Sequence, residues 1–237
     1  MPLVNVDIKY LDWVAAVYLS QDKVGIEEIT NGHDLHTANQ AAFGLPSRLI
    51  AKVFLFRIIF GGSAFSFARD PDFASVGFSA SKWEAVIERF YSKYKGIKLW
   101  HDELIRTATT TGHLSIPTGR QWTYELTRDK RGELKWPITT MKNYPVQGLE
   151  ADLMMIMRVS LFNRIKHEPL ILLVNSVHDS IVIDCPDKLV SFVIKTINDV
   201  LDAVPLNFKK LFGVEFNLPF RGEISVGQDW QNMEEVK

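Results

Sequence analysis

The stretch "NSVHDSIVID", residues 175–184, places a bare carboxylate between two segments that resemble strands. The apolar run "LILLV" at residues 170–174 leads into it, and the apolar triplet "IVI" at residues 181–183 leads out. A turn would favour Gly, Asn or Pro here, and a buried Asp without a partner is costly. One explanation is that Asp179 binds a metal ion, which requires a second carboxylate elsewhere in the chain.

Asp7 is the candidate for that second carboxylate. It lies near the end of "VNVDIKY", residues 4–10, whose alternation predicts a strand, and a helical pattern follows at residues 11–22. Two Asp residues on adjacent strands could hold Mg²⁺, which prefers hard oxygen ligands, and could support phosphoryl transfer. Taken alone, such a pair is more often explained as turn or cap aspartates.

Composition indicates a globular protein. The chain has 237 residues, of which 46% are hydrophobic and 23% are charged. No stretch approaches the roughly 20 apolar residues of a membrane helix, and the N-terminus lacks the basic start and apolar core of a signal peptide. A single cysteine, Cys185, allows no internal disulfide and no zinc cluster. We therefore predict a cytoplasmic protein with no membrane segment.

The net charge of −1 argues weakly against a nucleic-acid partner, but the distribution of charge matters more than the sum. Residues 47–69 contain four basic side chains and no acidic one: Arg48, Lys52, Arg57 and Arg69. Such a segment could face phosphates, although a helix with a solvated basic edge explains it equally well.

The order of elements predicts an α+β fold in which helices are inserted between a few strands of one sheet. Asp34 is a candidate cap for a helix that stops at Gly44, and Ser47 for a second helix that runs to the Gly61–Gly62 pair. Further helices are expected at residues 81–111, after Pro145 at 147–166, and at 186–204. Short strands are expected around 113–127, on both sides of Asp179, and within 220–230.

Six segments resemble family A DNA polymerases, the bacterial DNA polymerase I type, in the order that the family shows. "VDIKYLDWVAAVYLSQD" resembles motif A, and "HDLHTANQAAFG" resembles the segment after it. "RLIAKVFLFRIIFGGSAF" resembles motif B, "NYPVQGLEADLM" the family's Gln-Gly element, "VHDS" motif C, and "GQDW" the C-terminal signature. Each segment is weak alone, but together they cover nearly the whole chain and favour metal-binding roles for the two aspartates.

The resemblance implies a right-hand polymerase palm, built on a small antiparallel sheet, with a helical fingers insertion. Residues 1–30 and 112–237 would form the palm and 31–111 the fingers. In the palm, Asp7, Asp179 and the Ile8 carbonyl would bind two Mg²⁺ ions, with Mn²⁺ as a substitute. The implied reaction is template-directed transfer of a nucleotide from a dNTP to a primer 3′-hydroxyl.

The resemblance also assigns the motif B helix to nucleotide binding. Arg48, Lys52, Phe56 and Phe60 are spaced by four and would share one face. Arg48 and Lys52 would reach the triphosphate, with Lys52 as a proton donor to pyrophosphate, and the aromatic rings would bracket base and sugar. Core packing is the alternative for both rings. His36 matches a phosphate-binding histidine, with a surface role as its alternative.

Primer–template contacts are implied for four more residues. Asn143 and Gln147 share a helical face if the helix begins early enough, and they would check base-pair shape in the minor groove. His178 matches a histidine that touches the primer end. Arg120, in "TGR", matches a family arginine whose role is less defined.

The sequence departs from the family at several site positions. Lys9, Asp12 and Val14 stand where motif A usually has Ser, Glu and Arg. Asp12 is one methylene shorter than the Glu that excludes ribonucleotides, so we expect weaker sugar discrimination unless Tyr10 or Phe60 fills the gap. In motif C, Ser180 replaces the usual Glu, and Phe60 replaces the usual Tyr. Both essential aspartates are retained, so we expect an active enzyme.

The resemblance starts at residue 1. In family members a thumb, and often a 3′–5′ exonuclease domain, precedes the segment that this chain resembles. We therefore expect both to be absent from this chain, which is either a fragment or one half of a split enzyme. The initial Met and the C-terminal signature favour the second alternative, in which a separate polypeptide supplies the thumb and, as an option, the exonuclease. Such a split polymerase would fit a viral source, in which case the location would be the host-cell cytoplasm.

Two other functions compete with this interpretation. A catalytically degenerate subunit that binds DNA or assembles a replication complex is favoured by the unusual motif A and by Ser180. Retention of Asp7, Asp179, Arg48 and Lys52 argues against it. A His-Asp metal phosphohydrolase is suggested by "HD" pairs such as His33–Asp34 and His178–Asp179, but that class needs further ligands on helices.

Overall fold

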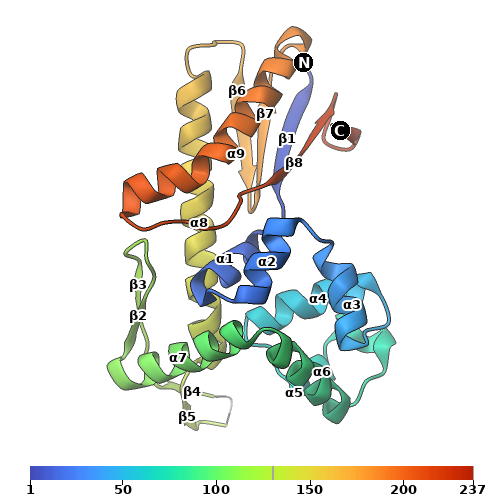
Figure 1. The fold of residues 1–237 in the computed structure, drawn as a ribbon, viewed down its shortest axis with the longest axis vertical. Coiled ribbons are helices and arrows are strands. Elements are labelled where there is room, and N and C mark those ends of the chain that lie inside the picture. The colour runs from blue at the N-terminus through green and yellow to red at the C-terminus, as the bar shows by residue number, and fades with distance from the viewer. Residues whose placement is uncertain (130, 237) are drawn as a thin grey trace. The chain divides into compact units, whose positions relative to one another are not determined.

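The computed structural model describes residues 1–129 and 131–236, which form two compact units (Figure 1). One unit combines Met1–Leu11 with the chain from Leu149 onward, and the other is Asp12–Gly148. The functional division into palm and fingers at residues 30 and 111 stays a prediction.

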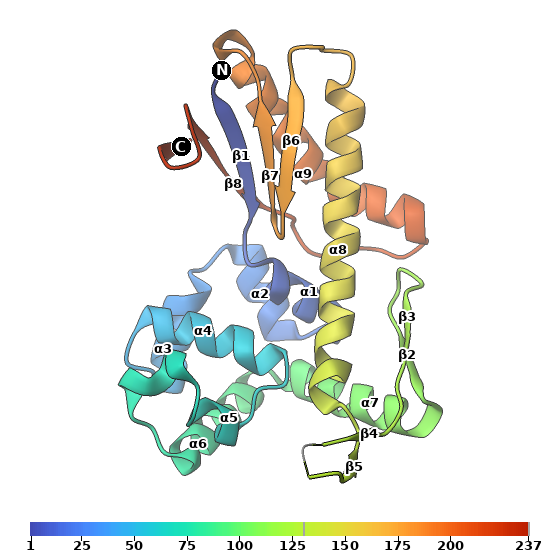
Figure 2. The same ribbon diagram turned by 180° about the vertical axis from the view of Figure 1, so that it is seen from behind.

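The first unit is built on an antiparallel sheet whose five strands lie in the order β6-β7-β1-β8-β9 (Figure 2). The strands are β1 Leu3–Ile8, β6 Leu172–Val177, β7 Ser180–Asp184, β8 Gly222–Gly227 and β9 Met233–Glu235. Alternation along β1 buries Val4, Val6 and Ile8 on one face and leaves Asp7 exposed on the other. The strand that we expected to end near Asp7 is therefore confirmed.

Helix α9, Val190–Phe212, covers one face of this sheet (Figure 1). It follows a short 3₁₀ turn, η2, at Asp187–Leu189. The packing is close, because a Cβ added at Gly222 would lie 2.9 Å from Val6 and 3.4 Å from Leu201 of α9. The helix buries one apolar stripe: Val193, Ile197, Val200, Leu201, Val204 and Phe208. Figure 2 shows the opposite face of the sheet, with the strands foremost.

Helix α8, Ile138–Ile165, begins in the second unit and ends in the first. We expected it only after Pro145, and that start was wrong. Pro145 lies inside the helix, where its missing N–H removes one backbone hydrogen bond. The earlier start gives the helix a further turn that carries Asn143.

The second unit is mainly helical. Its helices are α1 Leu11–Ser20, α2 Lys23–Asn31, α3 Leu35–Phe43, α4 Arg48–Ile59, α5 Ala64–Phe67, the 3₁₀ helix η1 Pro71–Val76, α6 Ala80–Lys93 and α7 Lys95–Thr111. The expected caps are confirmed: Asp34 accepts hydrogen bonds from the first amides of α3, and Ser47 from the amide of Ile50 in α4. Gly44 ends α3 with φ of 67°, a left-handed conformation that glycine adopts readily.

The single helix expected at residues 81–111 is two helices, because the chain bends at Tyr94. That residue has φ of −103° and ψ of 70°. The bend brings the backbone amides of Gly96 and Ile97 to the buried carboxylate of Asp22, at 2.7 and 3.3 Å. The same carboxylate accepts a hydrogen bond from Gly25 at 2.9 Å. One buried acid therefore joins the start of α2 to the start of α7.

An aromatic cluster forms the core of the second unit. Phe54 of α4 stacks on Trp83 of α6 with ring centroids 5.9 Å apart and planes at 13°. Further rings meet these two edge-on or tilted: Phe43, Phe67, Phe73, Phe78 and Phe90. Aromatic pairs at these separations add stability beyond the burial of their area, so the cluster fixes α4 against α6.

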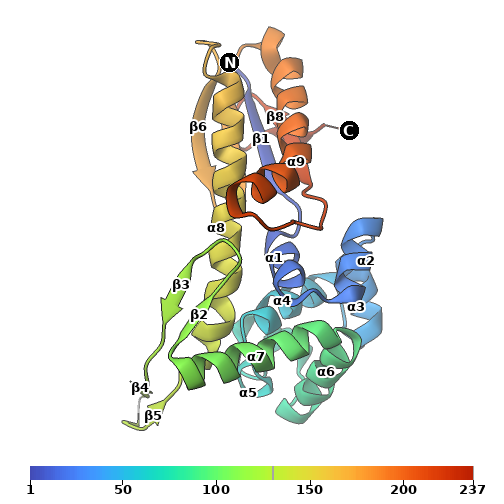
Figure 3. The same ribbon diagram turned by 60° about the vertical axis from the view of Figure 1, so that its left-hand side comes forward.

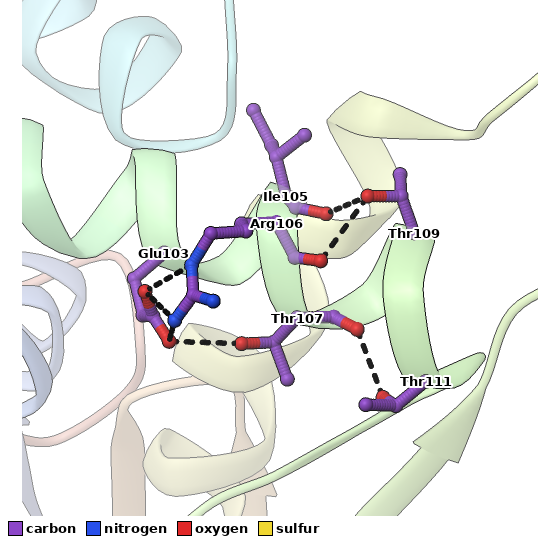
Figure 4. A network of polar contacts seen from close by, with 6 residues as sticks. All are labelled: Glu103, Ile105, Arg106, Thr107, Thr109 and Thr111. Carbon is purple, nitrogen blue, oxygen red and sulfur yellow. Dashed lines mark hydrogen bonds and ion pairs between the residues drawn. The ribbon is translucent and has the colours of Figure 1, made fainter.

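Two hairpins connect α7 to α8 in the second unit (Figure 3). They are β2 His113–Ser115 with β3 Gln121–Thr123, and β4 Thr127–Arg128 with β5 Leu134–Lys135. At the end of α7, threonine hydroxyls bond back to helix carbonyls, and Glu103 pairs with Arg106 and Thr107 (Figure 4). These local bonds satisfy polar groups on the exposed side of the helix.

Within residues 1–129 and 131–236, no helix is both long enough and apolar enough to cross a bilayer.

Candidate active site

Asp7 and Asp179 are brought together in the first unit. The backbone amide of Ile8 donates a hydrogen bond to the carbonyl of Asp179 at 2.9 Å, so the end of β1 lies beside the β6–β7 turn. The Asp7 side chain is exposed and that of Asp179 is partly exposed. The two carboxylates and the Ile8 carbonyl are hard oxygen donors of the type that Mg²⁺ binds. The donor set therefore fits the metal that the family resemblance implies.

The turn that carries Asp179 has an unusual backbone. His178 and Asp179 form the two-residue loop of the β6–β7 hairpin, and His178 has φ of 51°. Two-residue hairpins favour positive φ because of strand twist, and Gly or Asn usually supplies it. Only a few per cent of non-glycine residues adopt that conformation, and it costs energy. Keeping His178 and Asp179 here fits a site that needs both side chains.

The Ser180 hydroxyl donates its hydrogen to the hairpin backbone. The Ser180 side chain donates a hydrogen bond to the carbonyl of Val177 at 3.0 Å, and the residue is only 8% exposed. Its hydroxyl closes the hairpin. Among residues 1–129 and 131–236, no three or more His, Cys, Asp or Glu side chains converge as a metal site. The candidate centre therefore rests on the Asp7–Asp179 pair.

Glu223 is a carboxylate that the sequence analysis missed. In the sheet register, Asp7 lies opposite Ser180 of β7 and opposite Glu223 of β8. Glu223 also pairs with Lys9, with 2.8 Å between Nζ and Oε1. The alternation in "GEISVG", where Ile224 is buried, could have shown that Glu223 faces away from α9. The cross-strand partner could not be read from spacing in the sequence.

Arg48 and Asp34 form an ion pair in the second unit at the starts of α3 and α4. Arg48 donates from Nε and Nη2 to the two carboxylate oxygens of Asp34, at 3.0 and 3.2 Å. Hydrogen bonds from Arg48 and Thr37 hold the pKa of Asp34 well below its ordinary value. Asp34, which we predicted only as a helix cap, therefore also orients the guanidinium of Arg48.

His36 lies within electrostatic reach of the two cations predicted to bind phosphate. Its side chain is 3% exposed, so it is not the surface residue of the alternative interpretation. Burial, followed by the positive charges of Arg48 and Lys52, lowers the pKa of His36 to about 4. The imidazole is therefore neutral at pH 7 and would meet a phosphate as a hydrogen-bond partner, without a charge of its own.

The predicted face of α4 is confirmed. Arg48 and Lys52 are exposed and Phe56 is partly exposed, while the opposite face buries a continuous apolar set: Ile50, Ala51, Phe54, Leu55, Ile58 and Ile59. Lys52 Nζ lies 5.9 Å from the centre of the Phe56 ring. Phe60 caps the helix and is also partly exposed. Phe56 and Phe60 are thus neither fully buried nor fully exposed, and core packing stays the alternative to their predicted role.

Asn143 and Gln147 share a face of α8, because the helix begins at Ile138. Gln147 is exposed, and none of the described residues offers a hydrogen bond to the buried Oδ1 of Asn143. Arg120 approaches the same turn, since a Cβ added at Gly148 would lie 3.4 Å from its Cδ. These three predicted contacts with nucleic acid therefore lie close together within the second unit.

Tyr10 and Asp12 lie where β1 passes into α1. Tyr10 has φ of 54°, which turns the chain directly after Lys9. Asp12 is in the first turn of α1, where a negative charge is favourable for the helix dipole. Both side chains are partly exposed, and their assignment to sugar selection stays a prediction.

The family model described as "DNA polymerase family A" matches residues 2–232. The chain belongs to DNA polymerase family A. It is 27% identical over 238 residues to a thermostable DNA polymerase I of Thermus filiformis and 24% identical over 243 residues to that of Thermus aquaticus. These matches cover 96% and 98% of this chain but 27% of each relative. The chain thus spans about a quarter of the length of these family A polymerases.

A solved structure shows the same fold. The polymerase domain of Pol1 from M. smegmatis, in complex with DNA primer-template and dNTP, matches with a TM-score of 0.78 at 18% identity. The match covers 97% of this chain and 40% of that one. The expected α+β fold of a family A polymerase, with an antiparallel palm sheet and a helical fingers insertion, is confirmed.

Proposed function

We propose that this chain is the catalytic portion of a template-directed DNA polymerase that transfers a nucleotide from a dNTP to a primer 3′-hydroxyl. The observation that carries the proposal is the hydrogen bond from the Ile8 amide to the Asp179 carbonyl at 2.9 Å, which sets Asp7 beside Asp179. The family match over residues 2–232 supports it, as does the similarity to a polymerase domain solved in complex with DNA primer-template and dNTP.

The reaction forms a bond from the primer 3′-oxygen to the α-phosphorus and breaks the bond to pyrophosphate. Asp7, Asp179 and the Ile8 carbonyl would hold two Mg²⁺ ions, with Mn²⁺ as a substitute, which favour the deprotonated 3′-hydroxyl and stabilise the departing pyrophosphate. The proton of the 3′-hydroxyl leaves to solvent or a nearby base, and Lys52 would donate a proton to the pyrophosphate.

Arg48, Lys52 and His36 would bind the triphosphate. The fork that holds Arg48 on Asp34 uses Nε and Nη2, and a guanidinium binds phosphate oxygens through its planar set of N–H donors. Lys52 adds a point charge one helical turn away. Neutral His36 would add a hydrogen bond without adding charge. Phe56 and Phe60 would bracket the nucleoside, and Tyr10 and Asp12 would contact its sugar.

Asn143, Gln147, Arg120 and His178 would contact the primer–template. The buried Oδ1 of Asn143, which finds no donor among the described residues, is free to accept a hydrogen bond from a guanine amino group in the minor groove. The acceptors there are alike for all base pairs, so Gln147 can sense pair shape without reading sequence. Arg120 would bind a backbone phosphate.

A separate polypeptide that supplies a thumb is supported by exposed apolar side chains in the first unit. Met155, Val159 and Phe162 on α8 are 47–54% exposed and recur on one helix face. Leu172 and Val174 on β6 are 51% and 50% exposed. Among the described strands β6 has one neighbour only, and Figures 1 and 2 show it beside α8. Such surfaces mark interaction sites. Phe162→Asp should reduce co-purification of a partner, whereas Leu211→Asp, on α9, should not.

Primer extension tests the proposal. The assay contains Mg²⁺ and dNTPs and compares the chain alone with its Asp179→Ala variant and with material co-purified with natural partners. The control variant is Asp202→Ala, which replaces an exposed carboxylate on α9. Extension lost only in Asp179→Ala shows that this chain carries catalysis. Extension seen only with co-purified material, still dependent on Asp179, establishes a split enzyme. No Asp179-dependent extension under either condition rejects the catalytic function.

The second candidate is a catalytically degenerate subunit that binds DNA or assembles a replication complex. Ser180 favours this candidate, because a carboxylate at this position would give the metal site a third acid. The Ser180 hydroxyl instead donates a hydrogen bond to the Val177 carbonyl. This candidate predicts that primer–template binding persists in Asp179→Ala and that wild type and variant show equal, background extension.

A further inference from the structure

An ion pair lies beside Asp7, where β1 and β8 pair, and has no role in the proposed reaction. Lys9 Nζ lies 2.8 Å from Glu223 Oε1, and their side chains are 40% and 52% exposed. A surface pair of this exposure typically contributes little to folding. Stability alone therefore gives little reason to place two charges at this position.

The sheet register puts both charges next to Asp7. Glu223 is directly opposite Asp7 across β1 and β8, and residues paired in this way project from the same face with Cα atoms about 5.5 Å apart. Lys9 lies two residues after Asp7, and its amide bonds to the Arg221 carbonyl at 2.9 Å, which extends the pairing beyond β1. Alternation then places Lys9 on the face of Asp7, about 7 Å along the strand.

On the β7 side, the register partner of Asp7 is Ser180, a side chain without charge. The Ser180 hydroxyl is committed to the carbonyl of Val177. Glu223 is thus an acidic neighbour of Asp7 across the β1–β8 pair, in addition to Asp179, and Lys9 is the base that pairs with Glu223. The charge that a bound cation meets depends on both residues.

We propose that Lys9 and Glu223 are positioning charges that set the affinity of the Asp7–Asp179 site for divalent cations, Glu223 raising it and Lys9 lowering it. This inference rests on the proposed function, because it takes Asp7 and Asp179 as the metal ligands. A unit charge about 7 Å from a divalent ion, in water and with physiological salt, changes its binding by about two- to tenfold. The pair thus contributes little to the stability of the fold but changes the affinity for a divalent cation measurably.

The test measures Mn²⁺ affinity of the full chain by electron paramagnetic resonance of the free ion, without DNA or dNTP. Lys9→Ser leaves Glu223 unpaired, so the dissociation constant should fall about two- to tenfold. Glu223→Gln leaves Lys9 unpaired, so it should rise by a similar factor. The double variant should return to within about twofold of wild type, because both charges are gone.

A purely structural pair gives a different pattern. If the pair only stabilised the fold, both single variants would shift the Mn²⁺ dissociation constant in the same direction or leave it unchanged, and either result overturns the inference. The opposed shifts should also shrink in 0.5 M KCl, where the Debye length is about 4 Å. The matched control is the exposed pair Lys195–Asp199 on α9, whose Lys195→Ser and Asp199→Asn variants should leave Mn²⁺ binding unchanged.

Asp179→Ala separates this inference from the proposed function. Mn²⁺ binding that does not depend on Asp179 rejects the proposed ligands, and the inference falls with them. Asp179-dependent binding without opposed shifts in the Lys9 and Glu223 variants rejects only the inference. Circular dichroism of each variant confirms that the fold is intact before affinities are compared.

Discussion

Lowering the pH should destabilise this protein through His36, and replacing that residue should remove the effect. The side chain is 3% exposed, and its pKa is lowered from 6.5 to about 4, first by burial and then by Arg48 and Lys52. The folded pKa lies below the unfolded one. Between pH 6.5 and 4 the unfolded chain therefore binds a proton that the folded chain does not, and stability falls as the pH falls.

The size of the effect follows from the shift. A difference of about 2.5 pKa units corresponds to about 3 kcal/mol, at about 1.4 kcal/mol per unit. This loss is complete near pH 4, and it accumulates at up to about 1.4 kcal/mol per pH unit on the way. His101, whose pKa burial lowers to about 3, adds a second increment with the same sign.

Urea denaturation followed by circular dichroism, at pH values from 4.5 to 7.5, measures this slope. His36→Gln should lower the slope near pH 5 by about 1.4 kcal/mol per pH unit. His33→Gln is the matched control, since it replaces an exposed imidazole on the same segment. A His36→Gln slope equal to that of wild type would show that His36 is not held neutral, and the neutral role proposed for it with phosphate would fail.

Three further changes have defined outcomes. Asp12→Glu should raise the dNTP over rNTP preference about tenfold, equal to ~1.4 kcal/mol, and an unchanged ratio in single-nucleotide extension would count against Asp12 as the sugar contact. Ser180→Ala should cost about 1 kcal/mol in urea denaturation, because the Val177 carbonyl loses its donor, yet keep the Mg²⁺ requirement of extension; a changed requirement contradicts this. Gly62→Ala should cost about 2 kcal/mol or more, because its Cβ would lie 2.3 Å from the Phe67 ring; a melting temperature equal to that of wild type rejects the clash.

Local signals in the sequence predicted the helix ends well. Asp34, Ser47 and Gly44 cap α3 and α4 where expected, because capping depends on residues within one turn. The solvent-facing side of α4 could be predicted for the same reason, since spacing by four places Arg48, Lys52 and Phe56 in one row along the helix. The motifs supplied Asp7 and Asp179, and the pairing of β1 with β7 brings them together.

Features set by distant residues were missed. The break at Tyr94 depends on Asp22, which lies far away in the sequence and binds the amides of Gly96 and Ile97. The apolar pattern of residues 81–111 continues through the break, so periodicity predicted one helix. Glu223 was missed because cross-strand neighbours are fixed by sheet register, which the spacing of residues along one strand does not contain.

The stack of Phe54 on Trp83 gives the protein an internal optical reporter. Five of the six tryptophans lie within Asp12–Gly148, and the remaining one, Trp230, is 52% exposed. Intrinsic emission therefore comes mainly from the helical unit. Trp83 is 1% exposed and rests on a ring of α4, so a displacement of α4 relative to α6 would change its emission. Whether dNTP moves that helix can thus be tested by stopped-flow fluorescence, without attaching a dye.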